Sequence, residues 1–394
     1  MKKVSILILC MFNFFNISFS MLDPNDFLAL QSIRKKLTDM PGSNFFSTWD
    51  FTADPCSFSG VYCNSNKEKI IALNLGDSIA GKPGLEGRLH PALGKLSELT
   101  ELTLVPGRVM GSLPQTISHL KKLKFLAISN NFISGSIPKS FVTLKNLETI
   151  DLSYNQLTGS IPASITILPS LTNVLLCHNH LTGSIPSFYS KTLLRIDLKH
   201  NNLSGSLSPS SLPSSLEHLS LSSNQLTGSV NRLLVKLNRI NYLDLSYNRF
   251  TGPIPDPIFS FPLSSLQLQR NMFSGWVKPL SKVSITTVDL SYNRLTGQIP
   301  PLLSSVRNLY LNNNMFIGQV PGSFVERLMD EGIEVLYLQH NYLTGIEINP
   351  TADIPMTSSL CLQYNCMVPP VETPCPVAGK ERTRPADQCI KWKG

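Results

Sequence analysis

The stretch LETIDLSYNQLTGSIP, residues 147–162, recurs along the chain with small changes. Related stretches are LTNVLLCHNHLTGSIP at 171–186, INYLDLSYNRFTGPIP at 240–255 and ITTVDLSYNRLTGQIP at 285–300. The copies share one asparagine, and successive asparagines lie between 21 and 27 residues apart. The aligned residues are Asn131, Asn155, Asn179, Asn201, Asn224, Asn248, Asn271, Asn293, Asn314 and Asn341.

Each position of the repeat has a physical role. The alternation around Asp151 predicts a short strand that points Ile150 and Leu152 inward and the carboxylate outward. Asn155 ends this strand, where the backbone groups need new partners. Because an amide side chain both donates and accepts, stacked asparagines should bond neighbouring coils as a ladder. We expect Gly159 to permit a tight bend and Pro162 to keep the chain extended.

A period in the twenties with the spacing L-x-x-L-x-L-x-x-N-x-L is the leucine-rich-repeat pattern. One coil cannot bury its own leucines, but a stack of coils forms a continuous core and a long parallel sheet on one face. Two degenerate copies at 72–75 and 99–104 precede the regular ones, which makes about twelve repeats. The pattern therefore predicts an α/β solenoid whose two apolar ends are covered by caps.

The segments outside the repeats predict the domain organisation. Residues 1–20 resemble a secretory signal peptide, with two lysines, a short apolar run and small residues at the end. The apolar residues Phe27, Leu30, Ile33 and Leu37 are spaced for one helix face that covers the first coil. We expect an N-terminal cap at 21–68, repeats at 69–345, and a Cys/Pro-rich C-terminal cap with a basic tail at 346–394.

Secretion predicts disulfide bonds between the cysteines at the two ends of the chain. Cys56 and Cys63 have no near competitor and should pair with each other. The four C-terminal cysteines allow three connectivities, among which the sequence does not choose: Cys361, Cys366, Cys375 and Cys389. Cys177 stands alone in the middle of the repeats, where we expect a small, half-buried thiol.

The repeated phrase LTGSIP at 157–162 and 181–186 resembles the plant-specific class of extracellular leucine-rich repeats. The front segment, with DFLAL, TW, DPC and SGVYC, is similar to the cap of plant receptor-kinase ectodomains and polygalacturonase-inhibiting proteins. The resemblance covers roughly residues 24–345. It implies a right-handed superhelix of about 12 repeats, with ligands bound mainly on the strand-bearing inner surface.

This chain departs from both related groups. We expect no transmembrane span and find no kinase signature, unlike receptor kinases of this class. DPCSFSGVYC has single cysteines, where the inhibitors usually carry paired cysteines and a tryptophan, and the four-cysteine tail has no close counterpart among them.

The composition limits the function classes. With 15% charged and 42% hydrophobic residues the chain folds, and its net charge of +8 favours anionic partners such as de-esterified pectin. Basic residues gather at the C-terminus: Lys380, Arg382, Arg384, Lys391 and Lys393. Secretion excludes nucleic acid as a partner. Catalytic motifs are absent from the sequence, so we expect neither an enzyme nor a cofactor.

The variable residues around each strand are the candidate binding residues. One outward position directly precedes each asparagine, a second lies between the two leucines, and a third precedes them. At these positions we predict ligand contacts for Tyr154, His178, Arg195, His200, His218, Tyr247, Arg270, Tyr292, Tyr310 and Tyr337. Pairing of adjacent strands should place His178 beside His200 and Arg195 beside His218.

The histidine cluster should titrate across mildly acidic pH, with its basic neighbours lowering the pKa values. A metal site built from His178, His180 and His200 would lack a carboxylate or thiolate at a defined spacing, and we expect none. Asn202 begins the sequon Asn202-Leu-Ser204, where a glycan would crowd one rim of the inner face.

The sequence thus predicts a secreted binding protein of the plant cell wall and apoplast that recognises a protein, peptide or wall polysaccharide. Its role would lie in signalling, defence or wall organisation. The expected partners are an extracellular protein or peptide, a receptor kinase, and an anionic wall polysaccharide. Two alternatives remain open: an inhibitor of microbial polygalacturonase-type enzymes, and a structural wall protein bound to pectin.

Overall fold

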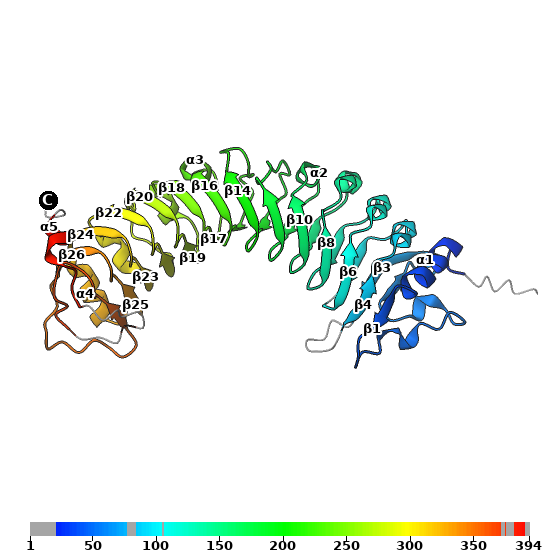
Figure 1. Ribbon diagram of the computed structural model, residues 1–394, viewed down its shortest axis with the longest axis horizontal. Helices are drawn as coiled ribbons and strands as arrows, with labels where there is room; N and C mark the ends of the chain where they lie inside the picture. Colours follow the sequence, from blue (N-terminus) through cyan, green and yellow to red (C-terminus); the bar gives the residue numbers. More distant parts are fainter. Residues whose placement is uncertain (1–20, 77–83, 105, 372–374, 376–381, 391–394) are drawn as a thin grey trace, which may run out of the picture.

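The leucines and isoleucines of the repeat point into one core that runs through the whole stack. The computed structural model describes residues 21–76, 84–104, 106–371, 375 and 382–390. Within this part of the chain Leu147, Ile150, Leu152 and Leu157 are fully buried against their counterparts in neighbouring coils. The coils form an arch (Figure 1). The expected signal peptide and three basic residues of the tail, Lys380, Lys391 and Lys393, lie outside the described residues.

The first leucine positions of each repeat form the sheet on the concave side of the arch, which we call the inner sheet (Figure 1). Of its 14 strands in the described residues, β2 runs antiparallel to β3 and the others are parallel. That leaves 13 parallel strands where the sequence predicted about twelve repeats, and the predicted solenoid is confirmed. The strands are β2 (Val61–Cys63), β3 (Ile70–Leu75), β5 (Glu101–Leu104), β7 (Phe125–Ile128), β9 (Thr149–Asp151), β11 (Asn173–Leu175), β13 (Arg195–Asp197), β15 (His218–Ser220), β17 (Tyr242–Asp244), β19 (Ser265–Gln267), β21 (Thr287–Asp289), β23 (Asn308–Tyr310), β25 (Val335–Tyr337) and β27 (Ser359–Cys361).

A second sheet, which the sequence did not predict, forms from the LTGS segments. It has 13 strands in the described residues. These segments were expected to bend at glycines such as Gly159; they do adopt a positive φ there, yet their backbones still pair, as Thr158 does with His180. The strands are β1 (Leu37–Asp39), β4 (Leu85–Arg88), β6 (Arg108–Ser112), β8 (Phe132–Gly135), β10 (Gln156–Ser160), β12 (His180–Gly183), β14 (Asn202–Ser206), β16 (Gln225–Ser229), β18 (Arg249–Gly252), β20 (Met272–Trp276), β22 (Arg294–Gly297), β24 (Met315–Val320) and β26 (Tyr342–Ile346).

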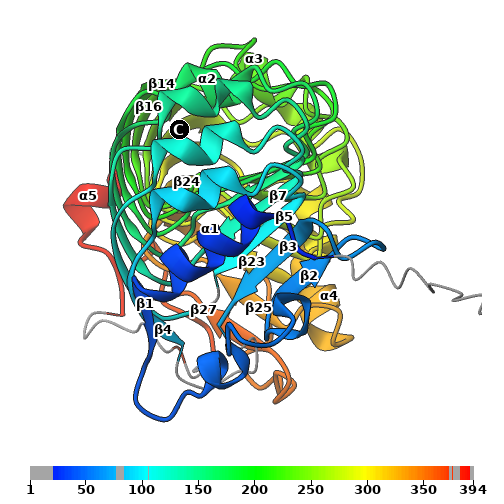
Figure 2. The ribbon, with the colours of Figure 1, turned by 90° about the vertical axis from the view of Figure 1, so that its right-hand side faces the viewer.

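Short helices line the third side of the coils. Viewed along the stack in Figure 2, the two sheets occupy different sides of each coil and the helices α2 and α3 lie above them. Most of these elements are single turns that begin next to the IP motif. They are η3 (Pro91–Lys95), η4 (Gln115–His119), η5 (Lys139–Thr143), α2 (Ala163–Thr166), α3 (Asn231–Leu234), η6 (Asp256–Ser260), η7 (Pro301–Ser305) and α4 (Gly322–Met329).

The asparagines form the expected hydrogen-bonded ladder between coils. The Asn155 amide Nδ2 donates to the carbonyl of Ile128 in the preceding coil at 2.7 Å and to that of Leu152 in its own coil at 3.2 Å. Its Oδ1 accepts the backbone N–H of Ile133 at 2.9 Å. Each rung therefore satisfies backbone groups of two coils at the point where the inner strand ends.

The ladder continues one coil further than the predicted boundary at residue 345. Asn365 is fully buried, donates to the carbonyls of Leu338 at 3.0 Å and Leu362 at 2.8 Å, and accepts from the backbone of Leu343 at 3.1 Å. Strand β27 extends the inner sheet in the same coil. The segment LCLQYN at 360–365 keeps the L-x-L-x-x-N spacing although its neighbours are Pro- and Cys-rich, so Asn341 is an interior rung.

The N-terminal cap combines a helix with the predicted disulfide. Helix α1 (Pro24–Arg34) starts where the carboxylate of Asp23 accepts a backbone hydrogen bond from Asn25, and it buries Leu30 and Ile33. Leu37 was expected on the same helix face, which is wrong: the helix ends at Arg34, and Leu37 pairs with Gly87 across β1 and β4. Two further turns, η1 (Phe45–Thr48) and η2 (Pro55–Ser57), lead to the bond between Cys56 and Cys63.

The C-terminal cap resolves the open connectivity, with bonds between Cys361 and Cys375 and between Cys366 and Cys389. Helix α5 (Ala386–Ile390) carries the last of these cysteines. The lone thiol of Cys177 is buried more completely than the sequence suggested.

The sequence predicted that Arg384 lies in a basic tail. In the structure it belongs to the C-terminal cap instead. Its Nε donates to the Asn341 carbonyl at 2.9 Å. Its guanidinium lies 4.1 Å from the ring centroid of Tyr342 and 4.7 Å from that of Tyr364. The planar cation is thus held between two aromatic rings of the last coils, a contact that the sequence separation concealed.

None of the helices in the described part of the chain is long and apolar enough to cross a membrane.

The ladder predicts a stability difference within one repeat. Asn248 donates to three carbonyls and accepts one backbone N–H, so Asn248→Ala leaves buried groups without partners and should destabilise the protein by about 1–3 kcal/mol. Asn341→Ala should cost a similar amount, because this rung is also interior. Denaturant unfolding monitored by circular dichroism measures both. The control Asn241→Ala removes an exposed amide from the same repeat as Asn248 and should change stability by less than about 0.5 kcal/mol. A loss for Asn241→Ala equal to that for Asn248→Ala would contradict the ladder.

Candidate binding surface on the inner sheet

The residue before each ladder asparagine adopts a left-handed backbone conformation. Its φ lies between 53 and 59° in every regular coil, although none of these residues is glycine. This conformation is unfavourable for most side chains, so the coil geometry imposes it. We call this row the inner-edge column: Asn130, Tyr154, His178, His200, Ser223, Tyr247, Arg270, Tyr292, Asn313, His340 and Tyr364.

The first part of the inner-edge column is a stack of aromatic rings. Tyr154 and His178 lie with ring centroids 4.2 Å apart and planes 12° from parallel. His178 and His200 repeat this arrangement at 4.2 Å and 20°. The predicted contact between His178 and His200 is therefore confirmed. The common left-handed turn explains it, because it directs these side chains the same way from successive coils.

The second part of the inner-edge column is a cation between two rings. The Arg270 guanidinium carbon lies 5.2 Å from the ring centroid of Tyr247 and 4.2 Å from that of Tyr292. A guanidinium held by its faces keeps the N–H groups at its rim free for an acceptor. Three of the predicted binding residues thus form one unit.

A second row of side chains lies at the first position of the inner strands. The strand register places Arg195 beside His218 and His218 beside Tyr242, and the last two rings stack at 4.3 Å with planes 6° apart. The predicted contact between Arg195 and His218 is confirmed. Sequence reasoning missed Tyr242 because it followed charged residues at this repeat position; reading the same position in the next coil would have found it.

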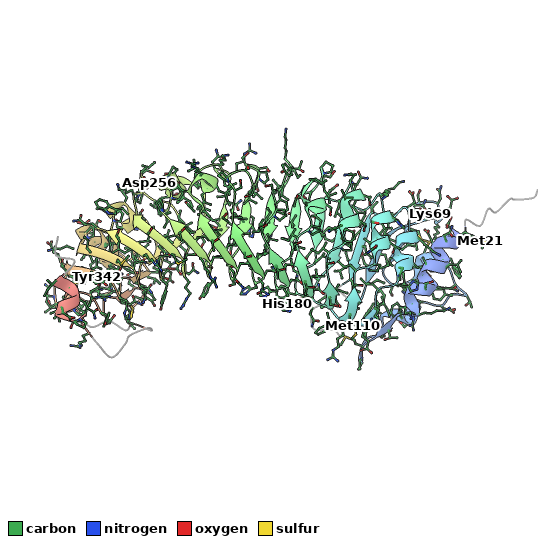
Figure 3. All side chains as sticks on the ribbon, turned by 45° about the horizontal axis from the view of Figure 1, so that its top comes forward. Met21, Lys69, Met110, His180, Asp256 and Tyr342 are labelled. Atoms are coloured by element: carbon green, nitrogen blue, oxygen red, sulfur yellow. A yellow bond between two sulfur atoms is a disulfide. The ribbon has the colours of Figure 1, made fainter. Side chains whose placement is uncertain are left out.

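The remaining predicted residues lie elsewhere. Tyr310 and Tyr337 pack edge to face at 5.2 Å near the C-terminal end of the inner sheet, several coils from the histidines. His180 opens β12 in the second sheet and is exposed there, so it does not join the histidine cluster (Figure 3). Asn202 also lies exposed in the second sheet, at the start of β14.

The aspartates between the two leucines serve the fold. The Asp244 carboxylate accepts the backbone N–H of Ser246 at 3.0 Å and its hydroxyl at 2.6 Å, and Asp289 binds Ser291 in the same way. Burial raises the pKa of Asp289 above its usual value. These carboxylates close the turn that leads into the inner-edge column.

Basic groups surround the histidines. The Lys199 ammonium lies 3.7 Å from the Asp197 carboxylate. Lys199 directly precedes His200 in the sequence. Burial, followed by His200 and Lys199, lowers the pKa of His178. Burial, followed by Arg195 and Lys199, lowers the pKa of His218 to about 4. The expected direction is thus confirmed, but His218 stays neutral across the mildly acidic range in which it was expected to titrate.

The described residues contain no group of three or more His, Cys, Asp or Glu side chains placed to hold a metal ion.

Comparison with known families matches two kinds of segment in this chain. Residues 23–64 match the leucine rich repeat N-terminal domain. Leucine rich repeat models match 97–157 and 121–181, and again 215–237, 239–261 and 284–306. The chain is a plant leucine-rich-repeat protein with an N-terminal repeat cap, related to receptor-like proteins.

Individual relatives agree with this assignment. Receptor like protein 22 of Arabidopsis thaliana is 34% identical over 146 residues, which is 35% of this chain and 18% of the relative. The match therefore spans much less than two thirds of that protein. The crystal structure of PEPR1-AtPEP1 superposes with a TM-score of 0.68 at 29% identity, over 87% of this chain and 52% of the other. The crystal structure of a plant ice-binding protein has a TM-score of 0.56 at 25% identity, over 85% and 99% of the two chains.

The fold is that of a plant leucine-rich-repeat ectodomain-like binding protein, similar to peptide hormone receptors.

The depressed pKa of His218 predicts a pH-dependent stability. The folded protein disfavours the protonated imidazole, whereas the unfolded chain binds the proton near pH 6.5. Stability is therefore full above about pH 6.5 and falls as the pH drops toward 4. The melting temperature of His218→Gln should decline less than that of the unchanged protein between pH 7 and pH 4.5. His119→Gln, far along the stack, is the control, and equal declines for all three proteins would contradict this assignment.

Proposed function

We propose that the protein is secreted into the plant cell wall space and recognises an extracellular peptide or an extended protein segment on its inner sheet. The observation that carries this proposal is the inner-edge column with its two stations. The aromatic station consists of Tyr154, His178 and His200, and the cationic station of Tyr247, Arg270 and Tyr292. The signal-like segment at 1–20 and the disulfides in both caps support an oxidising extracellular compartment.

The spacing of the two stations suits an extended chain. Strand β19, which precedes Arg270, follows β11, which precedes His178, by four steps in the inner sheet. At about 4.8 Å per strand the two side chains lie roughly 19 Å apart along the sheet, the length of about six extended residues. The small side chain of Ser223 stands between the stations and leaves room for the middle of a peptide.

The chemistry of the cationic station favours a carboxylate. Arg270 is preorganised by two ring faces, which reduces the entropy lost when its N–H groups bind an anion. Half-exposed tyrosine rings supply contact area that costs little side-chain entropy. A peptide with one terminal or isolated carboxylate fits these features best.

Synthetic peptides test the proposal directly. A library of extended peptides is bound to the protein in two forms, one with a free C-terminal carboxylate and one with an amide. We expect binders to prefer the carboxylate by about tenfold, and Arg270→Gln to abolish that preference. Arg232→Gln removes an exposed cation from α3, outside the inner sheet. This variant should keep the preference for the carboxylate. Binders whose affinity is indifferent to the terminal group and to Arg270 would contradict the proposal.

The two alternatives from the sequence predict other outcomes. An inhibitor of a microbial polygalacturonase would lower the release of reducing sugars by that enzyme and lose this effect on mutation of inner-sheet residues. A structural wall protein would depend on its C-terminal basic residues and would be released from wall material by salt.

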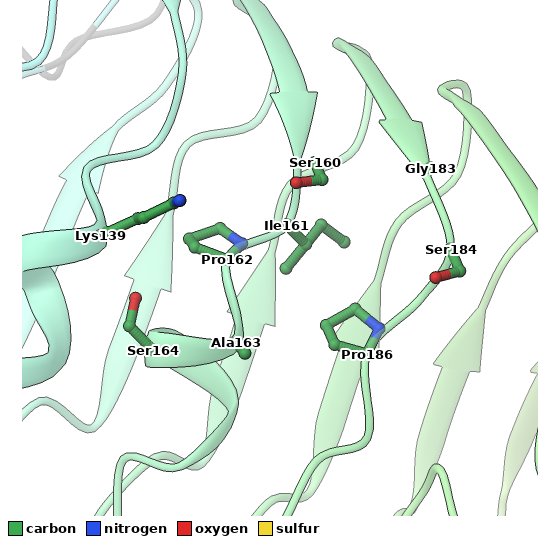
Figure 4. A pocket seen from close by; sticks show the side chains of 9 residues that line it. All are labelled: Lys139, Ser160, Ile161, Pro162, Ala163, Ser164, Gly183, Ser184 and Pro186. Carbon is green, nitrogen blue, oxygen red and sulfur yellow. The ribbon is translucent and has the colours of Figure 1, made fainter.

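Ice binding is a second candidate function, favoured by one feature of the second sheet. Serines occupy the same exposed position in successive coils. Figure 4 shows Ser160 and Ser184 at matching places on two neighbouring coils. The row consists of Ser112, Ser136, Ser160, Ser184, Ser206 and Ser229. With a strand spacing of about 4.8 Å, these hydroxyls form a regular array that can order water. The similarity to a plant ice-binding protein supports this candidate.

An ice recrystallisation assay tests the second candidate. If the array binds ice, the protein keeps ice crystals small, and Ser160→Tyr together with Ser184→Tyr abolishes this effect by breaking the flat row. The peptide preference for a carboxylate should not change in this variant. Crystals that grow as in buffer with the unchanged protein would exclude ice binding.

A further inference from the structure

Beyond Ser229 the serine row of the second sheet ends, and one of the following coils carries a tryptophan at that position. Trp276 ends β20 at the position that serines occupy in the earlier coils, and Pro253 and Gln298 occupy it in the coils on either side. The tryptophan side chain is 63% exposed. The described residues offer no hydrogen bond to its indole N–H. The ring is therefore a large aromatic surface that a ligand can reach.

The ring of Trp276 lies with its face on the backbone of the next coil. A Cβ atom on Gly297 would stand 3.1 Å from Cγ and Cδ2 of Trp276 and 3.2 Å from Cδ1. These nearly equal distances to three adjacent ring atoms show that the ring covers Gly297 with its face and not its edge. The indole is thus a flat platform held by one face, since any side chain at residue 297 would displace it.

One cation lies over this platform, and another lies near it on the adjacent strand. The Lys278 ammonium lies 5.0 Å from the ring centroid. Thr296 pairs with Trp276 across the strands. Arg294 is exposed and lies two residues before Thr296, on the same face of the sheet. Arg294 takes part in no ion pair among the residues that the structure describes, so its guanidinium group is free for an anionic ligand.

A shallow hollow completes the site. It measures about 400 Å³ and is lined by Trp276, Lys278, Pro253, Ile254 and Asp256. The Asp256 carboxylate adds an acceptor for hydroxyl groups at its wall. The combination of a flat apolar face, nearby cations and a single acceptor matches a ring that has C–H groups on its face, hydroxyls at its edge and a carboxylate.

We propose that the second sheet binds a uronic-acid-containing polysaccharide at this site, with one pyranose ring stacked on Trp276. The apolar C–H face of the sugar covers the indole in place of the exposed Lys278 ammonium, which moves to bind a carboxylate of the chain. Arg294 binds a second carboxylate. The strand spacing of about 4.8 Å is close to the length of one pyranose unit, so an extended chain can meet one coil with each sugar. This site lies on a different sheet from the proposed peptide surface and leaves that surface accessible.

Charge complementarity favours this ligand over a protein partner. The Lys278 ammonium and the Trp276 ring can bind a carboxylate and a sugar face, whereas a protein interface needs a larger apolar core than this small hollow provides. The net charge of +8 draws an acidic polymer to the molecule but does not direct it to this sheet. The stacking platform supplies that localisation.

Calorimetric titration with oligogalacturonate tests the proposal on the full-length protein. We expect Trp276→Ser, which restores the residue found at this position in the earlier coils, to weaken binding by about tenfold. Trp276→Phe should retain part of the affinity, because a smaller ring face remains. Arg294→Gln should weaken binding and reduce its dependence on salt. A neutral glucan oligomer of equal length should bind much more weakly than oligogalacturonate.

Two matched controls separate this site from the general positive charge. Tyr189→Ser removes an equally exposed ring outside the second sheet, and Arg108→Gln removes an exposed cation at the far end of it. Both should bind oligogalacturonate as the unchanged protein does, and Trp276→Ser should keep the peptide preference for a carboxylate. If Trp276→Ser binds oligogalacturonate with unchanged affinity, or if Arg108→Gln loses as much as Arg294→Gln, the proposal is overturned.

Discussion

The hydrogen bonds of the asparagine side chains are the constraint on which the rest of this structure depends. Each coil must turn inward after a three-residue strand, and that turn removes backbone groups from the sheet while they are still buried. The amide of Asn155 satisfies carbonyls at 128 and 152 and the N–H of 133 in one step. This link holds adjacent coils together at the point where the pairing of the inner strands ends.

The same turn creates the candidate binding surface. Because the residue before each asparagine is held in a left-handed conformation, its side chain leaves every coil in the same direction. Side chains such as His178 and His200 then stack at 4.2 Å, although 22 residues separate them in the sequence. The position contributes little to the core and tolerates Tyr, His, Arg, Ser or Asn, so ligand specificity can change there while the fold is retained.

The two sheets offer the protein two separate surfaces. The inner sheet is concave and carries stacked aromatic and cationic groups, which suits a peptide. The second sheet carries a row of small hydroxyls in its earlier coils and the exposed ring of Trp276 beyond them, which suits an extended polymer. Glycines of positive φ, such as Gly297, make the second surface possible because they let a neighbouring side chain lie directly on the backbone. A protein with both surfaces can bind a soluble ligand while it is held in a polysaccharide matrix.

The repeat by itself determined the solenoid, the inner strands and the asparagine ladder, because each follows from short-range periodicity. It also placed His178 beside His200, since equal positions in adjacent coils must be neighbours. The sequence also determined the pairing of Cys56 with Cys63, because no other cysteine lies near them. Tertiary structure alone decided the second sheet, whose glycine-containing segments have weak strand signals, and the pairing of Cys361 with Cys375. It also decided that Arg384 docks between Tyr342 and Tyr364, and that burial keeps His218 neutral, because such contacts and burial depend on residues distant in sequence.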